Sequence, residues 1–210
     1  MIIMDNDKTL KTGTTTLGIV AKDCVVIAAE KKATIGYMVD SKVAKKVYQL
    51  DDHIGLTIAG SVGDAMAVVR ILKAQFKLYK LDRGPISIRA ASSLLSNILH
   101  GNKHFPYYNQ FIIAGFDSRG PQVYCLDPVG GTSHMDKFYS TGSGSPFAYG
   151  VLEGDFKKNM TSDQAIGLAV KALKSAVGRD IASGGDGFSI VVINADGYKQ
   201  LTDEEIKKHN

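Results

Sequence analysis

Two pairs of helix-like segments divide the sequence into three groups of strand-like segments, and this order strongly constrains the fold. Apolar residues at helical spacing predict helices over residues 63–79, 87–99 and 146–156, from residue 161 onward, and briefly from residue 202. Alternating or continuous apolar runs predict strands over residues 14–21, 24–30, 36–41, 43–49, 53–61, 110–117, 122–126, 137–141, 188–193 and 198–201. Groups of strands separated by helix pairs are typical of antiparallel sheets covered by helices. The sequence therefore predicts an α+β fold.

Two of the predicted helices carry recognisable start signals. Thr161 is followed three residues later by Gln164, which is the spacing of a capping box. Ser145 precedes Pro146, so we expect Ser145 to cap the third helix and Pro146 to occupy its first position.

The length and composition allow one buried core and argue against nucleic-acid binding. The 210 residues are 44% hydrophobic, which suits a single domain. The net charge is +4, and the lysines and arginines are scattered along the sequence. A nucleic-acid interface needs basic residues gathered on one face, so we do not expect nucleic-acid binding.

The spacing of cysteines, histidines and apolar runs argues against disulfides, metals and membranes. Cys24 and Cys125 lie in apolar runs, which predicts buried thiols. The five histidines show no spacing typical of a metal site, and we expect no cofactor. No apolar run approaches the roughly 20 residues of a membrane helix, and residues 1–4 are too short for a secretory signal. We therefore expect a cytoplasmic protein.

Gly13 and Thr14 form a local pattern that suggests catalysis. They follow a polar stretch, residues 5–12, and precede a predicted strand. If the bond between them is cut, Thr14 carries both a hydroxyl nucleophile and a free α-amino group, whose pKa of about 7.7–8.0 suits proton transfer near neutral pH. Alternatively, residues 14–16 are β-branched threonines at the head of a strand. The pattern alone leaves both interpretations open.

Six short stretches, in order and at matching spacing, resemble the proteasome β subunits of the archaeal type. They are TTTLG (14–18), AAEKKAT (28–34), AKKV (44–47), TIAGSVGD (57–64), STGSGSPF (140–147) and RDIASGG (179–185). The resemblance covers the chain from Thr14 to its last helix. It implies a four-layer αββα sandwich, the fold of the N-terminal-nucleophile hydrolases, with two antiparallel sheets inside and helices outside. It also implies that residues 1–13 are a leader removed autocatalytically, leaving residues 14–210 as one catalytic domain.

The resemblance assigns roles to individual residues. Thr14 matches the nucleophile, and Gly13–Thr14 the bond cut during maturation. Lys46 matches a buried lysine beside the nucleophile, Glu30 its acidic partner, and Gly60 the residue whose backbone N–H binds the oxyanion. Without the resemblance, Lys46 reads as half of a solvated lysine pair and Glu30 as a charge at a strand end.

Two further groups complete the implied site. Ser143, Asp180 and Ser183 match the polar residues that surround the Thr14 amine, although Ser143 also suits a turn and Asp180 a loop closure. The wall of the pocket for the side chain before the cleaved bond is implied to contain Ala33, Ile58 and Val62. These residues are small or apolar, so we expect cleavage after hydrophobic residues.

The family also implies partners: α subunits, other β subunits in seven-membered rings stacked as two β rings between two α rings, and an ATPase that feeds protein substrates. Three alternatives remain open. The bacterial two-ring relative shares the threonine and lysine, but its shorter chain fits poorly. A non-catalytic ring subunit usually lacks one of these two residues. A basic binding module would show salt-dependent binding to nucleic acid.

Overall fold

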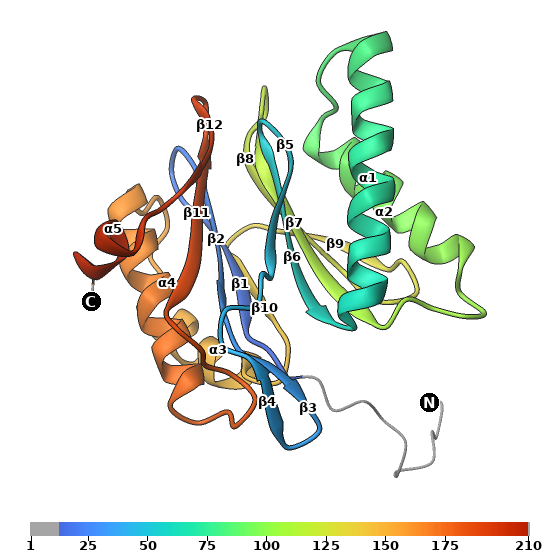
Figure 1. The fold of residues 1–210 in the computed structure, drawn as a ribbon. Coiled ribbons are helices and arrows are strands. Elements are labelled where there is room, and N and C mark those ends of the chain that lie inside the picture. The colour runs from blue at the N-terminus through green and yellow to red at the C-terminus, as the bar shows by residue number, and fades with distance from the viewer. Residues whose placement is uncertain (1–12, 210) are drawn as a thin grey trace.

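The computed structural model describes residues 13–209, whose strands form two five-stranded antiparallel sheets and a small hairpin (Figure 1). The first sheet has the spatial order β10 (Phe138–Thr141), β1 (Thr16–Val20), β2 (Val25–Glu30), β11 (Phe188–Asn194) and β12 (Gly197–Gln200). The second has the order β5 (Val47–Asp51), β6 (Ile54–Gly60), β7 (Asn109–Asp117), β8 (Gly120–Leu126) and β9 (Thr132–Met135). The predicted leader, residues 1–13, lies outside the described residues except for Gly13.

Helices cover the outer face of each sheet. The helices α1 (Val62–Arg83) and α2 (Ile88–Gly101) pack on the second sheet, and α3 (Ser145–Asp155) and α4 (Ser162–Val177) pack on the first. A short helix, α5 (Asp203–Lys207), lies beside β11. Figure 1 shows the resulting four layers, which confirm the predicted αββα sandwich. None of the helices described is long and apolar enough to cross a membrane.

The strand β2 shows why the two sheets pack face to face. Val26 and Ala28 point to the layer of α3 and α4, whereas Val25 and Ile27 point to the core between the sheets. All four are fully buried. A strand buried on both faces must lie between two apolar layers, because successive side chains point to opposite faces.

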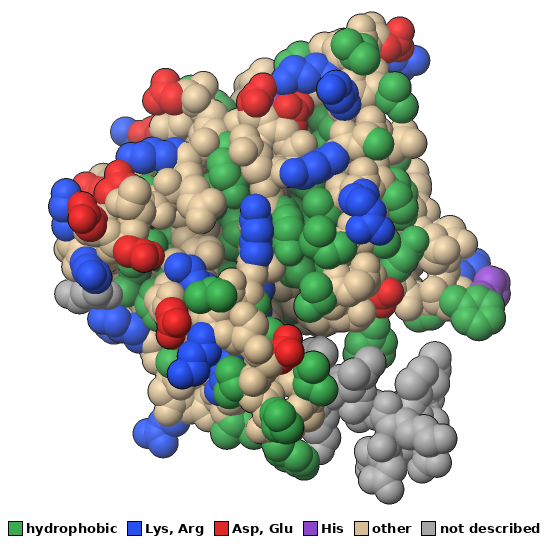
Figure 2. Space-filling view, viewed as in Figure 1, with side chains coloured by type: hydrophobic (Ala, Val, Ile, Leu, Met, Phe, Trp, Pro, Cys, Tyr) green, Lys and Arg blue, Asp and Glu red, His purple; other side chains and the backbone are tan. Residues whose placement is uncertain are grey.

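The hairpin of β3 (Ala33–Ile35) and β4 (Met38–Ser41) extends from the sandwich at the end where the described chain begins (Figure 1). Its turn contains Gly36, whose φ is 59°. The side chains of Ile35 and Met38 are exposed, and Figure 2 shows hydrophobic side chains gathered at this end of the molecule. The strand predicted over residues 36–41 is present from Met38 as β4, but residues 36–37 form the turn, and β3 before the turn was not predicted.

Three other local predictions differ from the structure. The strand β9 was not predicted, since its residues are polar and largely exposed and therefore give no apolar alternation. The strand predicted over residues 43–49 runs from Val47 to Asp51. Ser145 does not cap α3: Gly144 occupies the cap position, and the cap has no side-chain hydrogen bond. The capping box of Thr161 and Gln164 at the start of α4 is confirmed.

Candidate active site

The ends of several strands meet at one end of the sandwich. In the first sheet, Thr16 at the start of β1 pairs with Ala29 near the end of β2 and with Thr141 at the end of β10. In the second sheet, Val47 at the start of β5 pairs with Thr57 near the end of β6. Antiparallel pairing therefore brings the segments around residues 14, 30 and 143 together in the first sheet and those around residues 46 and 60 together in the second, and the packing of the two sheets joins the two groups.

The three threonines of residues 14–16 have different surroundings. The Thr16 hydroxyl lies 3.0 Å from the Thr57 hydroxyl and 2.6 Å from that of Thr141, and all three side chains are buried. Thr57 belongs to the second sheet, so the contact between Thr16 and Thr57 joins the two sheets two residues after Thr14. Thr16 is thus a structural residue, as the β-branched interpretation predicts for a threonine at the head of a strand.

Thr14 lies just before β1 and is 6% exposed. It is joined to Gly13, whose N–H donates to Thr34 Oγ1 over 3.4 Å. The Thr14 backbone N–H donates to Ser143 Oγ over 3.2 Å. The nitrogen that becomes an amine after cleavage therefore already faces a serine hydroxyl.

A chain of hydrogen bonds extends from the Thr14 nitrogen to Thr15. Ser143 Oγ donates to Asp180 Oδ2 over 2.7 Å, and Ser183 Oγ donates to the same oxygen over 2.6 Å. The Thr15 hydroxyl lies 2.6 Å from Ser183 Oγ. Because the Ser183 hydroxyl donates its proton to Asp180, the Thr15 hydroxyl is the donor in this bond. Ser143, Asp180 and Ser183, predicted as one polar shell, thus form one network.

Glu30 is fully buried, and both oxygens of its carboxylate accept hydrogen bonds. Its Oε1 accepts bonds from Lys46 Nζ and from the Thr15 N–H, the latter over 3.2 Å. Its Oε2 accepts bonds from the N–H groups of Lys32, at 2.6 Å, and Gly184, at 2.9 Å. A buried carboxylate is tolerated when it is paired and hydrogen-bonded in this way.

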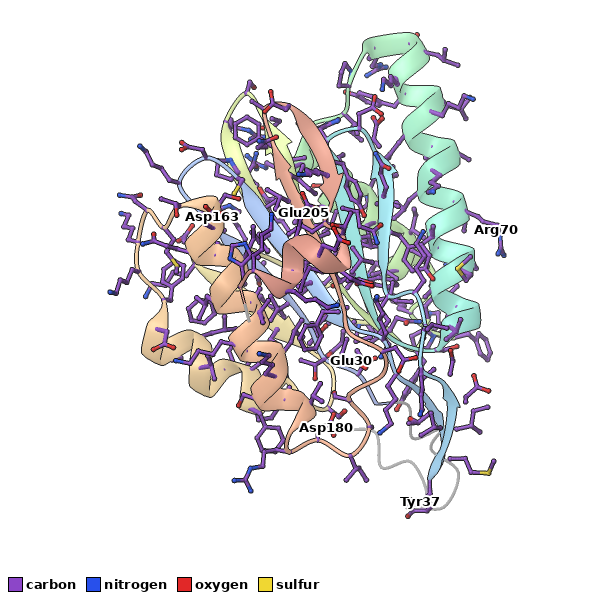
Figure 3. The ribbon with its side chains drawn as sticks, turned by 60° about the vertical axis from the view of Figure 1, so that its left-hand side comes forward. Glu30, Tyr37, Arg70, Asp163, Asp180 and Glu205 are labelled. Carbon is purple, nitrogen blue, oxygen red and sulfur yellow. The ribbon has the colours of Figure 1, made fainter. Side chains whose placement is uncertain are left out.

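Lys46 is 6% exposed, so it is not half of a solvated lysine pair. Besides its ion pair with Glu30, its Nζ donates to the Lys32 carbonyl over 2.5 Å. Burial lowers the pKa of the Lys46 ammonium from its ordinary value, and the neighbouring Glu30 carboxylate partly opposes this effect. Figure 3 shows Glu30 inside the sandwich and Asp180 on the loop after α4, at the same end of the molecule.

Two hollows adjoin Thr14. A cavity of about 380 Å³ is bounded by Thr14, Ala59, Gly60, Tyr108, Asn109, Gln110, Pro128, Gly142 and Ser143. A smaller pocket of about 50 Å³ is lined by Thr14 and Lys46 together, and by the three residues predicted for a substrate pocket, Ala33, Ile58 and Val62. Thr14 therefore stands between the two hollows, and Gly60 contributes to both.

The structure brings all the predicted site residues together, and it adds residues that the sequence did not single out. Thr15 joins the Ser183 hydroxyl to the Glu30 carboxylate through its side chain and backbone. Asn109 lines the larger cavity beside Gly60. The only sequence signal for Asn109 is a polar residue directly before an apolar strand, which is too common to predict a site.

The chain is similar to known proteins over most of its length. Residues 10–193 match the family described as "Proteasome subunit". The protein named "Proteasome subunit beta" in Methanoregula boonei is 51% identical over 199 residues, which are 94% of this chain and 93% of that protein. Proteins with the same name in Methanocaldococcus fervens and Methanosphaerula palustris are 52% and 49% identical, over 93% and 98% of this chain and 88% and 97% of the relatives. The chain therefore belongs to the proteasome subunit family, and within it to the β subunits.

Proposed function

We propose that the chain is a catalytic β subunit, a threonine endopeptidase that cuts protein substrates into peptides after losing residues 1–13. The observation that carries the proposal is the arrangement around Thr14. Its backbone nitrogen begins a hydrogen-bonded chain through Ser143 to Asp180, and Lys46 lines the same small pocket. A structural threonine accounts for a paired backbone N–H, but not for the Ser143–Asp180 pair and the buried lysine gathered beside it.

In the proposed mechanism, Thr14 Oγ1 attacks the substrate carbonyl carbon and forms an ester, which water then hydrolyses. The free Thr14 amine accepts the hydroxyl proton, directly or through a water molecule, and returns it to the leaving amine. Ser143 and Asp180 hold this amine in position, because the Thr14 nitrogen already contacts Ser143 Oγ.

Lys46 and Glu30 set the electrostatics of the step. The Lys46 ammonium disfavours protonation of the nearby Thr14 amine and stabilises the developing alkoxide. Glu30 keeps that ammonium buried and charged through their ion pair. The Gly60 N–H stabilises the oxyanion of the tetrahedral intermediate.

Leader removal is proposed to use the same groups on the Gly13 carbonyl. Attack by Thr14 Oγ1 on this carbonyl forms an ester between Gly13 and the Thr14 side chain, with transfer of the acyl group from nitrogen to oxygen. Water then cleaves the ester and releases residues 1–13. Gly13 is closely enclosed, since a Cβ at this position would overlap Ala182.

Substrate choice and assembly complete the proposal. The small pocket has apolar walls at Ala33, Ile58 and Val62, which supports cleavage after hydrophobic residues. By family membership, the subunit assembles in the cytoplasm with α subunits and further β subunits into stacked rings, which an ATPase supplies with unfolded proteins.

The proposal is tested by expressing the chain with its α subunit and measuring both the mass of the β chain and the hydrolysis of apolar, basic and acidic reporter peptides. We expect a chain that begins at Thr14 and hydrolysis mainly of the apolar reporter. Thr14→Ala should retain the leader and lose hydrolysis, whereas Thr14→Ser, which keeps a hydroxyl, should retain part of both reactions. Assembled particles that keep the leader and cleave no peptide would instead identify a non-catalytic assembly subunit.

A further inference from the structure

Asn109, the first residue of β7, is buried in an unusual way. It is 2% exposed, yet among residues 13–209 its side-chain oxygen has no hydrogen-bond partner. Its side-chain nitrogen donates to the Ser61 carbonyl over 2.9 Å. A buried amide oxygen without a donor is unfavourable, so the position is not explained by stability alone. The hydrogen bond that this side chain donates is accepted by the backbone of Ser61, the residue next to Gly60.

Asn109 belongs to a group of contacts that fix the backbone after Gly60. The Ser61 N–H donates to the Tyr108 carbonyl over 2.9 Å, and the Tyr108 N–H donates to Asp64 Oδ2 over 2.9 Å. We call Asp64, Tyr108 and Asn109 the Gly60 clamp. Because the clamp bonds both the N–H and the carbonyl of Ser61, it fixes the orientation of the two peptide groups that follow Gly60.

Gly60 itself has a φ of 142°, a conformation that residues with side chains rarely adopt. A Cβ at this position would strike the Tyr108 carbonyl and would lie 2.9 Å from Asn109 Oδ1. On the preceding side, Ala59 pairs with Gln110 in the second sheet. The Gly60 N–H is therefore held between the sheet on one side and the clamp on the other.

We infer that Asn109 is a positioning residue for the reaction, which aims the Gly60 N–H at the oxyanion formed on the carbonyl that Thr14 attacks. Gly60, Asn109 and Thr14 all border the larger cavity. Asn109 does not itself touch the reacting atoms; it acts through Ser61 and Gly60. This inference rests on the proposed function, because it presupposes an oxyanion at this place. Small errors in the direction of an oxyanion donor are costly, since the donor is effective only when it is oriented in advance.

The test compares Asn109→Asp with Asn102→Asp in processed, assembled particles. Asn109→Asp keeps the shape but places a carboxylate oxygen against the Ser61 carbonyl. Asn102 is a matched control: its side-chain nitrogen donates to the Ile98 carbonyl over 3.0 Å at the exposed end of α2. The measurements are kcat and KM for an apolar reporter peptide, and the affinities of a peptide aldehyde and of the peptide alcohol of the same sequence. The aldehyde forms a hemiacetal with Thr14 that carries the oxyanion, whereas the alcohol cannot.

We expect Asn109→Asp to lower kcat by about tenfold to a hundredfold with KM nearly unchanged. The aldehyde should bind more weakly by a similar factor, and the alcohol should bind as it does to the wild type. Asn102→Asp should behave as the wild type in every measurement. An unchanged kcat for Asn109→Asp, or an equal loss of affinity for aldehyde and alcohol, would overturn the inference.

A second variant keeps the test decisive if Asn109→Asp does not assemble. Asp64→Ala removes the acceptor for the Tyr108 N–H from a partly exposed position and leaves Asn109 unchanged. It should lower kcat and the aldehyde affinity in the same direction but by less, and an unaltered kcat would count against the clamp. Wild-type particles that cleave no reporter would refute the proposed function itself, a result separate from any effect of the variants.

Discussion

In the proposed mechanism, Lys46 combines a structural and a chemical contribution at a single residue. A buried ion pair is costly to form unless further hydrogen bonds satisfy both partners. Here Glu30 accepts additional hydrogen bonds from backbone N–H groups, and the Lys46 ammonium also donates to the Lys32 carbonyl. The cation is thus held close to Thr14 at a position where burial disfavours its charge.

The lowered pKa of Lys46 predicts how activity depends on pH. Because burial is the largest effect on this pKa, we expect the alkaline loss of kcat/KM to have a midpoint below 10.5, the ordinary value for lysine. The tyrosines Tyr139 and Tyr198, whose pKa values burial raises to about 12, titrate above this range. The measurement is a pH profile with an uncharged reporter peptide.

The free energy of unfolding provides the control for this profile, because its dependence on pH has the opposite sign to that of activity. When the folded pKa of a lysine lies below the unfolded pKa, the unfolded chain binds more protons between the two values. The contribution of Lys46 to the free energy of unfolding therefore rises as the pH rises from the folded pKa toward 10.5, while activity falls. A comparison of wild type with Lys46→Met by urea unfolding isolates this contribution. An alkaline midpoint at or above 10.5 would contradict the prediction.

A second prediction at the scale of the residue concerns Gly13 and Ala182. A Cβ on residue 13 would overlap the Ala182 side chain and would lie 3.0 Å from Ser143 Oγ. Gly13→Ala should therefore displace the bond that we propose to be cut, and slow the proposed removal of the leader. Mass spectrometry at intervals after mixing with α subunits measures the rate.

The overlap also predicts a compensating change. Ala182→Gly alone should process at about the wild-type rate, and the double variant Gly13→Ala with Ala182→Gly should be faster than Gly13→Ala. If the double variant is as slow as the single one, crowding at Ala182 is not the reason for the glycine.

At the scale of the element, the starts of α3 and α4 differ in a way that can be measured. Thr161 caps α4 through its side chain, whereas Ser145 makes no capping bond at the start of α3. Thr161→Ala should lower the free energy of unfolding by about 1 kcal/mol. Ser145→Ala should change it by less than about 0.5 kcal/mol. Urea unfolding followed by circular dichroism compares the two, and equal losses would show that the capping bond of Thr161 is not what stabilises α4.

The same contrast explains which parts of the fold could be predicted from the sequence. Apolar periodicity and the capping box at Thr161 are local signals, and the elements they predict are present in the structure. The strand β9 carries no such signal, because it pairs only at the edge of the second sheet and its residues are largely exposed. Ser145 failed as a predicted cap because the turn at Gly142 and Gly144 sets the start of α3.

The residues of the candidate site likewise fall into those that could be predicted from the sequence and those that could not. Thr14, Lys46 and Ser143 could be named in advance because they lie in short stretches that resemble a known family. Asn109 could not, because its contact with the Ser61 backbone depends on the start of β7 lying beside the end of β6. A contact between a side chain and a backbone group far away in the sequence leaves no local pattern.

At the scale of the whole molecule, the site requires both sheets at a fixed separation. Thr14 precedes β1 of the first sheet, whereas Lys46 precedes β5 and Gly60 ends β6 of the second. Gly18 lies where the sheets face each other: a Cβ there would come within 3.1 Å of Ile112 Cγ2 and 3.2 Å of a Val123 methyl group. The absence of a side chain at residue 18 thus helps to keep Thr14, the proposed nucleophile, near the Lys46 ammonium.

Gly18→Ala should therefore disturb the site from within the core. Overpacking of this kind costs about 1–3 kcal/mol of unfolding free energy, and a small increase in sheet separation should also lower kcat. Ile112→Leu removes the nearest methyl branch and keeps the volume, so the double variant should regain part of both the stability and kcat. A double-mutant cycle that includes Ile112→Leu alone should give a favourable coupling above about 0.5 kcal/mol. If the two changes are additive, or if kcat is unaffected while stability falls, the separation of the sheets does not control the geometry around Thr14.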